Sequence, residues 1–581
     1  MNMTKVILFW LFCAILLISV VVIYGQQNEN LKQNVSKNPP LHGWTCENNK
    51  CHKSIDANAT SLGTCKMLCY DSPPLWPKPK QLEIINKNST LFQKEHIVLT
   101  IHSPNEVKSE LEEAANTFLE SLPKNSTKYH LYEGEVQILK LNIHVKERNI
   151  ELSTSTKESY TLFCQKLPEA ILVNIFASNY FGARHGLETL SQLIWHDTLT
   201  NKLRILHDIK ITDEPSFNHR GVLIDVSRHF FSIDILKKAV DGMAASKLNV
   251  LHLHLSDAAS FPLQLPNSKI SSNGAYDENS IYTPEDIKHL VQYAKKRGIR
   301  TILEIDAPSH VSPEAWPKDE VLCADPDMFR ATLNPDNPET LNTLQSVYEN
   351  LFELGTDPET FHIGDDEVVT ECWSNTVSAQ KEDNNVYNVW SKFTNAMMER
   401  VKIANNNTLP KNIVLWSSPL TDNYIKSLSY QKDLVVQYWF GQFGHILDNG
   451  YKIIFSTVGQ WYLDCGFGPW KKIDQYGSCD PYTDWKKFYH YRPWKDYPQR
   501  LSQVLGGEVC LWSEQVSPDD VETRLWPRTA AFAERVWSDP DIIDIDDVAR
   551  RIDFHSERLK ERGFRVAAIW PQICWLYPER C

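Results

Sequence analysis

The pattern of apolar and polar positions changes near Phe217. From there onward, short apolar segments alternate with amphipathic stretches of helical period. The apolar segments are GVLIDVSR, NVLHLHLSD, RTILEIDAP, TFHIGDDE, NIVLWSS, LVVQYW, YKIIFSTVGQWYLD and QVLGGEVCLWSE. Strands that each lead into a helix in this way predict a closed (β/α)₈ TIM barrel over residues 216–581. The alternative is an open doubly wound sheet, but no glycine-rich phosphate loop follows the first strand.

The segment before the barrel has a mixed pattern. Over residues 77–215, strand-like alternation in HIVLTIH, VQILKLNIHV and AILVNIF is interspersed with helical runs such as SELEEAANTFLESL and YFGARHGLETLSQLIW. We therefore expect an α/β protein in which a smaller α+β domain precedes the catalytic barrel. Residues 26–76 are polar, contain cysteines and end in DSPPLWPKPK, which is typical of a disulfide-tied linker.

The amino-terminal segment, residues 1–25, directs the chain into the secretory pathway. Lys5 precedes an unbroken apolar run from Val6 to Tyr24, followed by the polar stretch GQQNENLKQN. This pattern predicts a signal peptide. The run is also just long enough to span a bilayer, so an uncleaved type II membrane anchor is the alternative. We expect an extracellular or lysosomal protein that associates with a membrane only if this segment is retained.

Cysteine usage fits an oxidising compartment. Loss of Cys13 with the leader would leave twelve of the 13 cysteines, an even number that suits disulfides. The candidate pairs are a cluster of Cys46, Cys51, Cys65 and Cys69, the local pairs Cys465 with Cys479 and Cys574 with Cys581, and Cys323 with Cys372. Zinc in the cluster is the alternative, but an oxidising lumen favours disulfides over a zinc site. Glycosylation sequons begin at Asn34, Asn58, Asn88, Asn125 and Asn406.

Charge and composition narrow the class of ligand. The net charge of −13 opposes binding to a phosphate backbone, so we expect no nucleic-acid partner. The chain contains 18 tryptophans and 22 tyrosines. Aromatic rings stack on the apolar faces of sugars, although large core residues account for some of these rings as well.

Chemistry in a (β/α)₈ barrel takes place at the carboxyl ends of the strands. Acids, one imidazole and several aromatic rings lie near those ends. They are Arg220, Asp257, His310, Asp366, Glu367, Trp416, Trp439, Tyr462, Asp464, Trp512 and Glu514. Together they predict a pocket that binds a polar ring and works by proton transfer.

The acidic run Asp365, Asp366 and Glu367 carries the most specific chemistry. Three neighbouring carboxylates repel one another, so we expect at least one raised pKa, as a proton donor to a glycosidic oxygen needs. The alternatives are a solvated acidic loop or a helix cap. Adjacent strand residues point to opposite sides, which rules out two facing catalytic carboxylates. One carboxyl can instead act as acid and base while its neighbour supports a nucleophile supplied by a 2-acetamido sugar.

These motifs resemble those of the glycoside hydrolase family 20 β-N-acetylhexosaminidases, and of the insect type in particular. The matches cover nearly everything after residue 77. They are HRGVLIDVSRHF from His219, HLHLSD from His252, SFP from Ser260, EIDAPSH from Glu304, HIGDDE from His362, WYLD from Trp461 and GGEVCLWSE from Gly506. The resemblance implies an exo-acting hydrolase of terminal, non-reducing N-acetylhexosamine in chitooligosaccharides or glycoconjugates, with retention and no cofactor.

The resemblance also implies a role for each candidate residue. Glu367 is the general acid/base, and Asp366 orients the acetamido nitrogen while the carbonyl oxygen attacks C1. Tyr462 hydrogen-bonds that oxygen, and Asp257 with His310 supports Glu367. The sugar is held by Arg220, Trp416, Trp439, Asp464, Trp512 and Glu514. No metal is expected, because His252 and His254 have no third ligand near them in the sequence. Homodimers are compatible with the family.

The chain departs from the family at three positions. Asp365 replaces a glycine and would add a negative charge beside the catalytic pair, which predicts a raised acid limb of the pH profile. Leu253 and Ala259 replace a larger tryptophan and glutamine and are expected to shrink side chains near the barrel interior. The alternative function is a catalytically weak or inactive glycan-binding or adhesion protein, silenced by Asp365. The loop between Cys465 and Cys479 contains Trp470 and Tyr476, which are the candidates for binding a second sugar.

Overall fold

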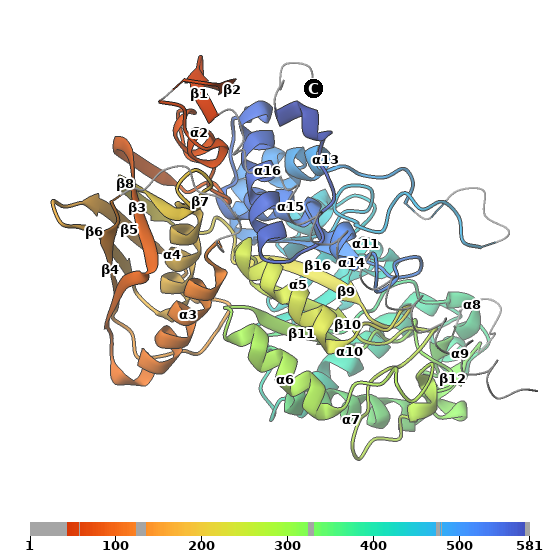
Figure 1. Ribbon diagram of the computed structural model, residues 1–581. Helices are drawn as coiled ribbons and strands as arrows, with labels where there is room; N and C mark the ends of the chain where they lie inside the picture. Colours follow the sequence, from red (N-terminus) through yellow and green to blue (C-terminus); the bar gives the residue numbers. More distant parts are fainter. Residues whose placement is uncertain are drawn as a thin grey trace, which may run out of the picture.

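The computed structural model describes residues 43–56, 58–123, 135–323, 331–471, 477 and 479–575. An amino-terminal sheet domain lies beside a larger barrel domain (Figure 1). The predicted leader, residues 1–25, lies outside the described residues, so neither the signal peptide nor the anchor is tested. Within the described ranges, every helix is too short or too polar to cross a bilayer.

The larger domain is the expected (β/α)₈ barrel. Its eight parallel strands lie in the order β11-β10-β9-β18-β17-β16-β15-β14. A parallel bridge between Ala307 and Gly364, just beyond β11 and β14, closes the ring. The strands are β9 (His219–Asp225), β10 (Val250–His254), β11 (Arg300–Glu304), β14 (Thr360–His362), β15 (Asn412–Trp416), β16 (Leu434–Tyr438), β17 (Lys452–Phe455) and β18 (Val504–Leu511).

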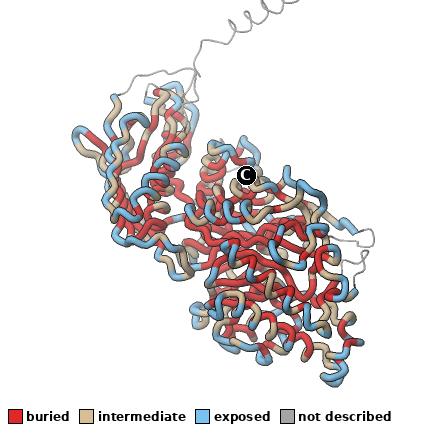
Figure 2. Tube along the Cα trace, turned by 90° about the horizontal axis from the view of Figure 1, so that it is seen from below, coloured by how far each residue is buried: buried red, intermediate tan, exposed pale blue. Residues whose placement is uncertain are grey.

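Helices surround this barrel and keep its strands buried (Figure 2). The sequence marks their ends. Thr283 and Asp286 form a capping box at the start of α6 (Pro284–Lys295), and Gly355, with φ of 97°, ends α7 (Pro338–Leu354). The other principal helices are α5 (Ile233–Ala245), α10 (Val386–Ala404), α13 (Trp485–His490), α15 (Arg528–Ser538) and α16 (Ile545–Glu561).

The amino-terminal domain is a sheet with helices packed on one face. Its strand order is β3-β4-β6-β5-β8-β7, and β3 also pairs with β8. Burial alternates along the strands, so that one face packs against α3 (Lys108–Ser121) and α4 (Tyr180–Gln192). The strands are β3 (Gln81–His102), β4 (Gln137–Val145), β5 (Tyr160–Lys166), β6 (Ala170–Ala177), β7 (Ile194–Asp197) and β8 (Lys202–Asp213).

The segment before this domain has more structure than its polar composition predicts. A hairpin of β1 (Gly43–Glu47) and β2 (Lys50–Ser54) precedes α2 (Leu62–Leu68), and the disulfides Cys46–Cys69 and Cys51–Cys65 join them. The four thiols are therefore not zinc ligands. Trp76 is fully buried and donates from Nε1 to the carbonyl of Ala530 at 3.0 Å. The segment thus attaches to the barrel.

Two further predicted disulfides are present in the barrel. The Cys323–Cys372 bond connects the segments that follow β11 and β14, and the Cys465–Cys479 bond lies within the connection from β17 to β18. For the predicted pair of Cys574 with Cys581, Cys581 lies outside the described residues. Cys164 and Cys510 are buried thiols without a disulfide.

A buried ion pair joins the two domains. Glu158 accepts from both terminal nitrogens of Arg220, at 2.6 and 3.0 Å, and lies 3.0 Å from His185. All three side chains are almost fully buried. Burial alone would raise the pKa of Glu158, but the Arg220 guanidinium and His185 lower it to about 2. The carboxylate is therefore charged in the folded protein.

We predict that Glu158→Ala lowers the free energy of unfolding by about 3 to 5 kcal/mol at pH 7, because it leaves a buried guanidinium unpaired. Removing the exposed carboxylate of the Lys80–Glu214 pair by Glu214→Ala should cost less than about 1 kcal/mol. Denaturant unfolding measures both. The Glu158 contribution is present above an unfolded-state pKa near 4.5 and is lost as the pH falls towards 2. Equal losses in the two variants would contradict this view of the junction.

Candidate functional site

A pocket of about 170 Å³ opens at the carboxyl ends of the barrel strands. It contains ten of the eleven residues that the sequence predicted for the site. They are Asp257, His310, Asp366, Glu367, Trp416, Trp439, Tyr462, Asp464, Trp512 and Glu514. The pocket is also lined by Arg228, His254, Asp306, Val458 and Cys479, which the sequence prediction did not include.

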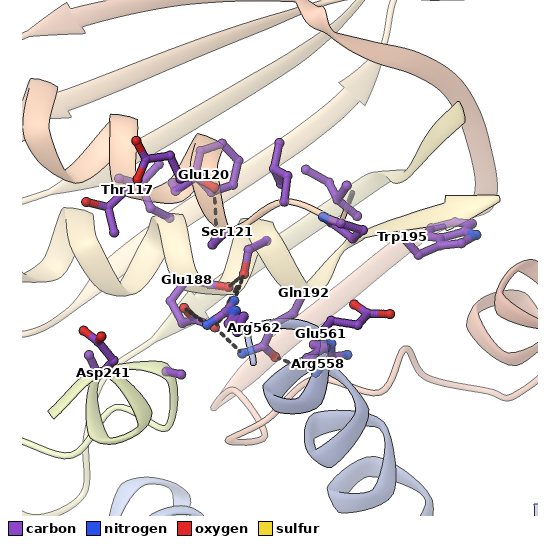
Figure 3. Close-up of a pocket in the computed structure, with 18 of the residues that line it drawn as sticks. Thr117, Glu120, Ser121, Glu188, Gln192, Trp195, Asp241, Arg558, Glu561 and Arg562 are labelled. Carbon is purple, nitrogen blue, oxygen red and sulfur yellow. Dashed lines mark hydrogen bonds and ion pairs between the residues drawn. The ribbon is translucent and has the colours of Figure 1, made fainter. Parts of the chain in front are cut away.

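A larger cavity, of about 1010 Å³, lies at the junction of α2, α3, α4 and α16 (Figure 3). Several of its polar and charged side chains contact one another. Arg562 pairs with Glu188 at 3.0 Å, and Arg558 donates to Gln192 at 3.3 Å. None of the eleven predicted site residues lines this cavity. The smaller pocket is therefore the candidate active site.

Glu367 stands at the mouth of the pocket at the end of a short relay. Its Oε2 lies 3.2 Å from Nε2 of His310, and Nδ1 of His310 lies 3.1 Å from Oδ2 of Asp257. The Glu367 side chain is 57% exposed, whereas that of Asp257 is 5% exposed. The relay therefore runs from a buried carboxylate to one that a substrate can reach.

The charges of this relay follow from its contacts. Burial would raise the pKa of Asp257, but Arg228 and His310 hold it well below its usual range. Burial disfavours a charged His310, yet Asp257 and Glu367 raise its pKa well above the usual range. The hydrogen bond from His310 in turn lowers the pKa of Glu367. A carboxylate at Glu367 therefore faces a cationic imidazole.

Asp366 occupies a different environment from its neighbour. Its Oδ1 is buried and has no hydrogen-bond partner among the described residues. Burial raises the pKa of Asp366 to about 7, with a further contribution from Glu367 and an opposing one from His310. An unpartnered carboxyl oxygen that lines the pocket is suited to accept a hydrogen bond from a bound ligand.

Asp306 is a pocket residue to which the sequence analysis assigned no role. It lies in the matched EIDAPSH motif and is 2% exposed. Burial, together with the neighbouring Asp366, raises the pKa of Asp306 well above its usual range. Its Oδ1 accepts from the backbone N–H of Asp365 at 3.1 Å. Asp306 thus fixes the start of the acidic loop, and its raised pKa favours the protonated form beside Asp366.

Aromatic side chains form the walls of the pocket, and hydrogen bonds orient two of them. Trp416 donates from Nε1 to Oε1 of Glu304 at 2.9 Å, and Trp439 donates to the carbonyl of Ser417 at 2.8 Å. The ring of Trp512 lies 5.8 Å from that of Trp416. Burial raises the pKa of Tyr462 well above the usual range, so its hydroxyl keeps a proton to donate.

Polar groups gather at another part of the pocket. Burial and the nearby Glu514 raise the pKa of Asp464 to about 8. Burial also raises the pKa of Glu514, against the effect of Arg228. Oδ1 of Asp464 is buried and has no hydrogen-bond partner among the described residues. These carboxyls and the guanidinium offer both donors and acceptors to sugar hydroxyls.

The arginine of the pocket is Arg228 and not Arg220, which the sequence analysis chose. Arg220 begins β9 at the amino end of the barrel, where it pairs with Glu158. Arg228 follows the carboxyl end of the same strand, and its Nη2 lies 2.6 Å from Oδ2 of Asp257. The strand direction carried the missing signal, because Arg228 follows the apolar run GVLID and Arg220 precedes it.

Asp365 does not line the pocket, although the sequence prediction placed its charge beside the catalytic pair. Its side chain is fully buried and accepts from Nε1 of Trp390 at 2.8 Å and from Oγ1 of Thr394 at 2.9 Å, both on α10. Burial raises the pKa of Asp365 well above its usual range, which favours the neutral form. Its φ of 72° explains why glycine suits this position.

Two other sequence interpretations also change. Leu253 packs in the core between barrel and helices, because the alternation along β10 turns His252 and His254 to the barrel interior instead. His252 has a possible third ligand after all, since donor atoms of His252, Glu304 and His362 lie within 4.8 Å of one another. Contacts between these side chains explain why they lie so close together.

Comparison with known proteins agrees with this geometry. The catalytic domain of glycosyl hydrolase family 20 matches residues 217–540, and a domain described as beta-acetyl hexosaminidase like matches residues 75–193. The chain belongs to family 20 of the glycosyl hydrolases. This assignment confirms the resemblance drawn from the sequence motifs, and with it the enzyme class of β-N-acetylhexosaminidase.

Similar family 20 proteins span almost the whole chain. A probable beta-hexosaminidase of Drosophila melanogaster, fdl, is 34% identical over 94% of this chain and 92% of its own length. A chitooligosaccharidolytic beta-N-acetylglucosaminidase of Bombyx mori is 33% identical over 93% of this chain and 95% of its own. Among solved structures, a Flavobacterium johnsoniae chitobiase has a TM-score of 0.65 at 26% identity, covering 84% of this chain and 73% of its own.

We predict that Arg228→Met lowers kcat/KM by about 10- to 100-fold, because it removes charged hydrogen bonds inside the pocket. Arg220→Met should lower the melting temperature instead and leave kcat/KM of the folded protein within about threefold of wild type. Steady-state kinetics and thermal unfolding of both variants separate the two arginines. The reverse pattern would contradict their assignment.

We predict that Asp365→Asn leaves the pH profile of kcat/KM in place, within about 0.2 unit, because this side chain is buried against α10 and does not line the pocket. Asp365→Gly should also keep the profile, while losing stability with the two hydrogen bonds to α10. The profile and the melting temperature are measured together. A displacement of the acid limb by half a unit or more would restore the charge-based interpretation.

Proposed function

We propose that this β-N-acetylhexosaminidase removes terminal, non-reducing N-acetylhexosamine by substrate-assisted catalysis with retention. The observation that carries the proposal is the contrast between two adjacent carboxyls. Glu367 is exposed and contacts a cationic imidazole, while the Oδ1 atom of Asp366 is buried and has no hydrogen-bond partner among the described residues. An enzyme that uses two facing carboxylates has no need of such a pair, whereas a substrate amide gives each carboxyl its own task.

The steps follow from these environments. Glu367 donates a proton to the glycosidic oxygen as the bond to C1 breaks, and the acetamido carbonyl oxygen attacks C1 to form an oxazolinium ion. Asp366 accepts a hydrogen bond from the amide N–H and balances the developing positive charge, while Tyr462 donates to the carbonyl oxygen. Water then attacks C1 as the bond from C1 to the acetamido oxygen breaks and the acetamide re-forms. The water gives its proton to Glu367, which restores the acid.

Binding of the sugar sets the protonation states that these steps need. Entry of a ring excludes water from Glu367 and favours its neutral form, and an amide N–H beside Asp366 favours the carboxylate. As Glu367 loses and regains its proton, His310 and its partner Asp257 adjust the positive charge that faces the Glu367 carboxyl. Trp416, Trp439 and Trp512 would enclose the acetamido group and the ring, with Arg228, Asp464 and Glu514 at the hydroxyls.

The size of the pocket and its polar groups favour exo action. About 170 Å³ suits a single sugar ring rather than several rings of a chain. We infer chitooligosaccharides or the terminal N-acetylglucosamine of glycoconjugates as substrates, and the chitooligosaccharidolytic relative of Bombyx mori supports the first. Trp470 is 45% exposed and is the described candidate for a second sugar, whereas Tyr476 lies outside the described residues.

The disulfides support an oxidising compartment, and we infer that the enzyme works in the secretory pathway. The described part of the pocket gives no support to an inactive binding protein, because Asp365 packs against α10 and does not line the pocket. Homodimer formation remains an expectation from the family.

We predict that Glu367→Gln lowers kcat by about 1000-fold or more on chitobiose, because the leaving sugar needs a proton. The loss should be smaller on an aryl N-acetylglucosaminide, whose leaving group is a weaker base. A thiazoline that mimics the cyclised amide should inhibit wild type, and the matching glucoside without the acetamido group should not be cleaved. Equal rates for wild type and Glu367→Gln, or for the two sugars, would overturn the proposal.

A further inference from the structure

A line of buried imidazoles and carboxylates runs through the barrel interior and ends at the catalytic relay. At its far end, His219 of β9 contacts Glu508 of β18 at 2.5 Å, and Glu508 accepts from Nδ1 of His252 at 3.0 Å. Nε2 of His252 and Nδ1 of His254 then share Oε2 of Glu304, at 3.0 and 2.8 Å. Each of these side chains is at most 4% exposed.

The line meets the relay at Asp257. Nε2 of His254 lies 3.1 Å from Oδ2 of Asp257, which is the same oxygen that contacts His310 at 3.1 Å and Arg228 at 2.6 Å. One carboxylate oxygen is thus shared by three basic groups. A positive charge on His254 therefore weakens the electrostatic attraction between Asp257 and His310.

The surroundings of His254 favour its cationic form. On neighbouring elements, Glu304 and Asp257 face its two nitrogens, Arg228 lies close by with opposite effect, and the ring of Trp512 is 5.0 Å away. Burial disfavours the charge, but Glu304 and Asp257 raise the pKa of His254 to about 9. His219 differs, because burial lowers its pKa and leaves it neutral.

We propose that His254 is a positioning residue whose cationic imidazole weakens the hold of Asp257 on His310 and thereby sets the pH range in which Glu367 can donate its proton. Glu304 acts one step further away, by keeping His254 charged and fixing its ring through Nδ1. This inference rests on the proposed role of Glu367 as general acid/base. It gives the buried line a catalytic purpose beyond filling the barrel.

The sign of the effect follows from electrostatics. His254→Gln removes a positive charge and keeps an amide N–H that can donate to Asp257. Loss of a nearby cation raises the pKa of every neighbouring group, including His310 and Glu367. The limbs of the kcat/KM profile that report this pair should therefore move to higher pH, by about 0.5 to 1 unit.

The matched control is His219→Gln. It makes the same substitution in the same buried line, but at a neutral histidine far from the relay. We expect a lower melting temperature and an unchanged pH profile. The profiles are measured with an aryl N-acetylglucosaminide for both variants and wild type, on protein that thermal unfolding shows to be folded.

The outcomes separate this inference from the proposed function. If Glu367→Gln is inactive and His254→Gln shifts the profile upward while His219→Gln does not, the inference holds. An unshifted His254→Gln profile, or equal shifts in both variants, would overturn it and leave the function of Glu367 intact. If His254→Gln does not fold, neutron diffraction of wild type gives a direct answer, since deuterium on only one nitrogen of His254 at neutral pH would refute the proposal.

Discussion

The site depends on one constraint, which is that a carboxylate buried in a barrel has to be neutralised by its neighbours. Asp257 meets this requirement with Arg228, His254 and His310, all at one oxygen. An isolated buried carboxylate would take up a proton, and His310 would then lose its charged partner. The state of Glu367, which His310 contacts, therefore depends on the whole set of contacts around Asp257.

The barrel supplies this set because its strands run parallel. Side chains that follow the carboxyl ends of β9, β10, β11 and β14 converge on a single opening, although they are far apart in the sequence. The alternation of side chains along a strand also contributes, since every second residue of β10 faces the barrel interior. Glu304, at the end of β11, contacts His252, His254 and Trp416, and so links the buried line to a wall of the pocket.

Much of this arrangement could be read from the sequence, because apolar runs define the strands and motifs lie at their ends. The sequence prediction failed where the direction of a strand, or a contact between segments distant in the sequence, determines which side chains meet. Arg220 and Arg228 both flank β9, and only the polarity of the strand distinguishes them. The pairing of His252 with Glu304 joins separate strands and leaves no mark in local spacing.

Asp365 shows the same limit more sharply. A charge next to two catalytic acids suggests repulsion, but the chain turns at φ of 72° and directs this side chain away from the pocket. The prediction of a linker over residues 26–76 was incomplete for a related reason, since the polar composition of this segment gives no sign that Trp76 is buried. In both cases the partner is a helix distant in sequence, α10 for Asp365 and α15 for Trp76.

The bond between the acidic loop and α10 connects the pocket to the helical layer around the barrel. Trp390 and Thr394 are one helical turn apart and both donate to the carboxyl of Asp365, so the three positions form one unit. The same loop carries Asp366 and Glu367, whereas neither Trp390 nor Thr394 lines the pocket. A substitution on this helix would therefore reach the catalytic pair without altering any side chain that lines the pocket.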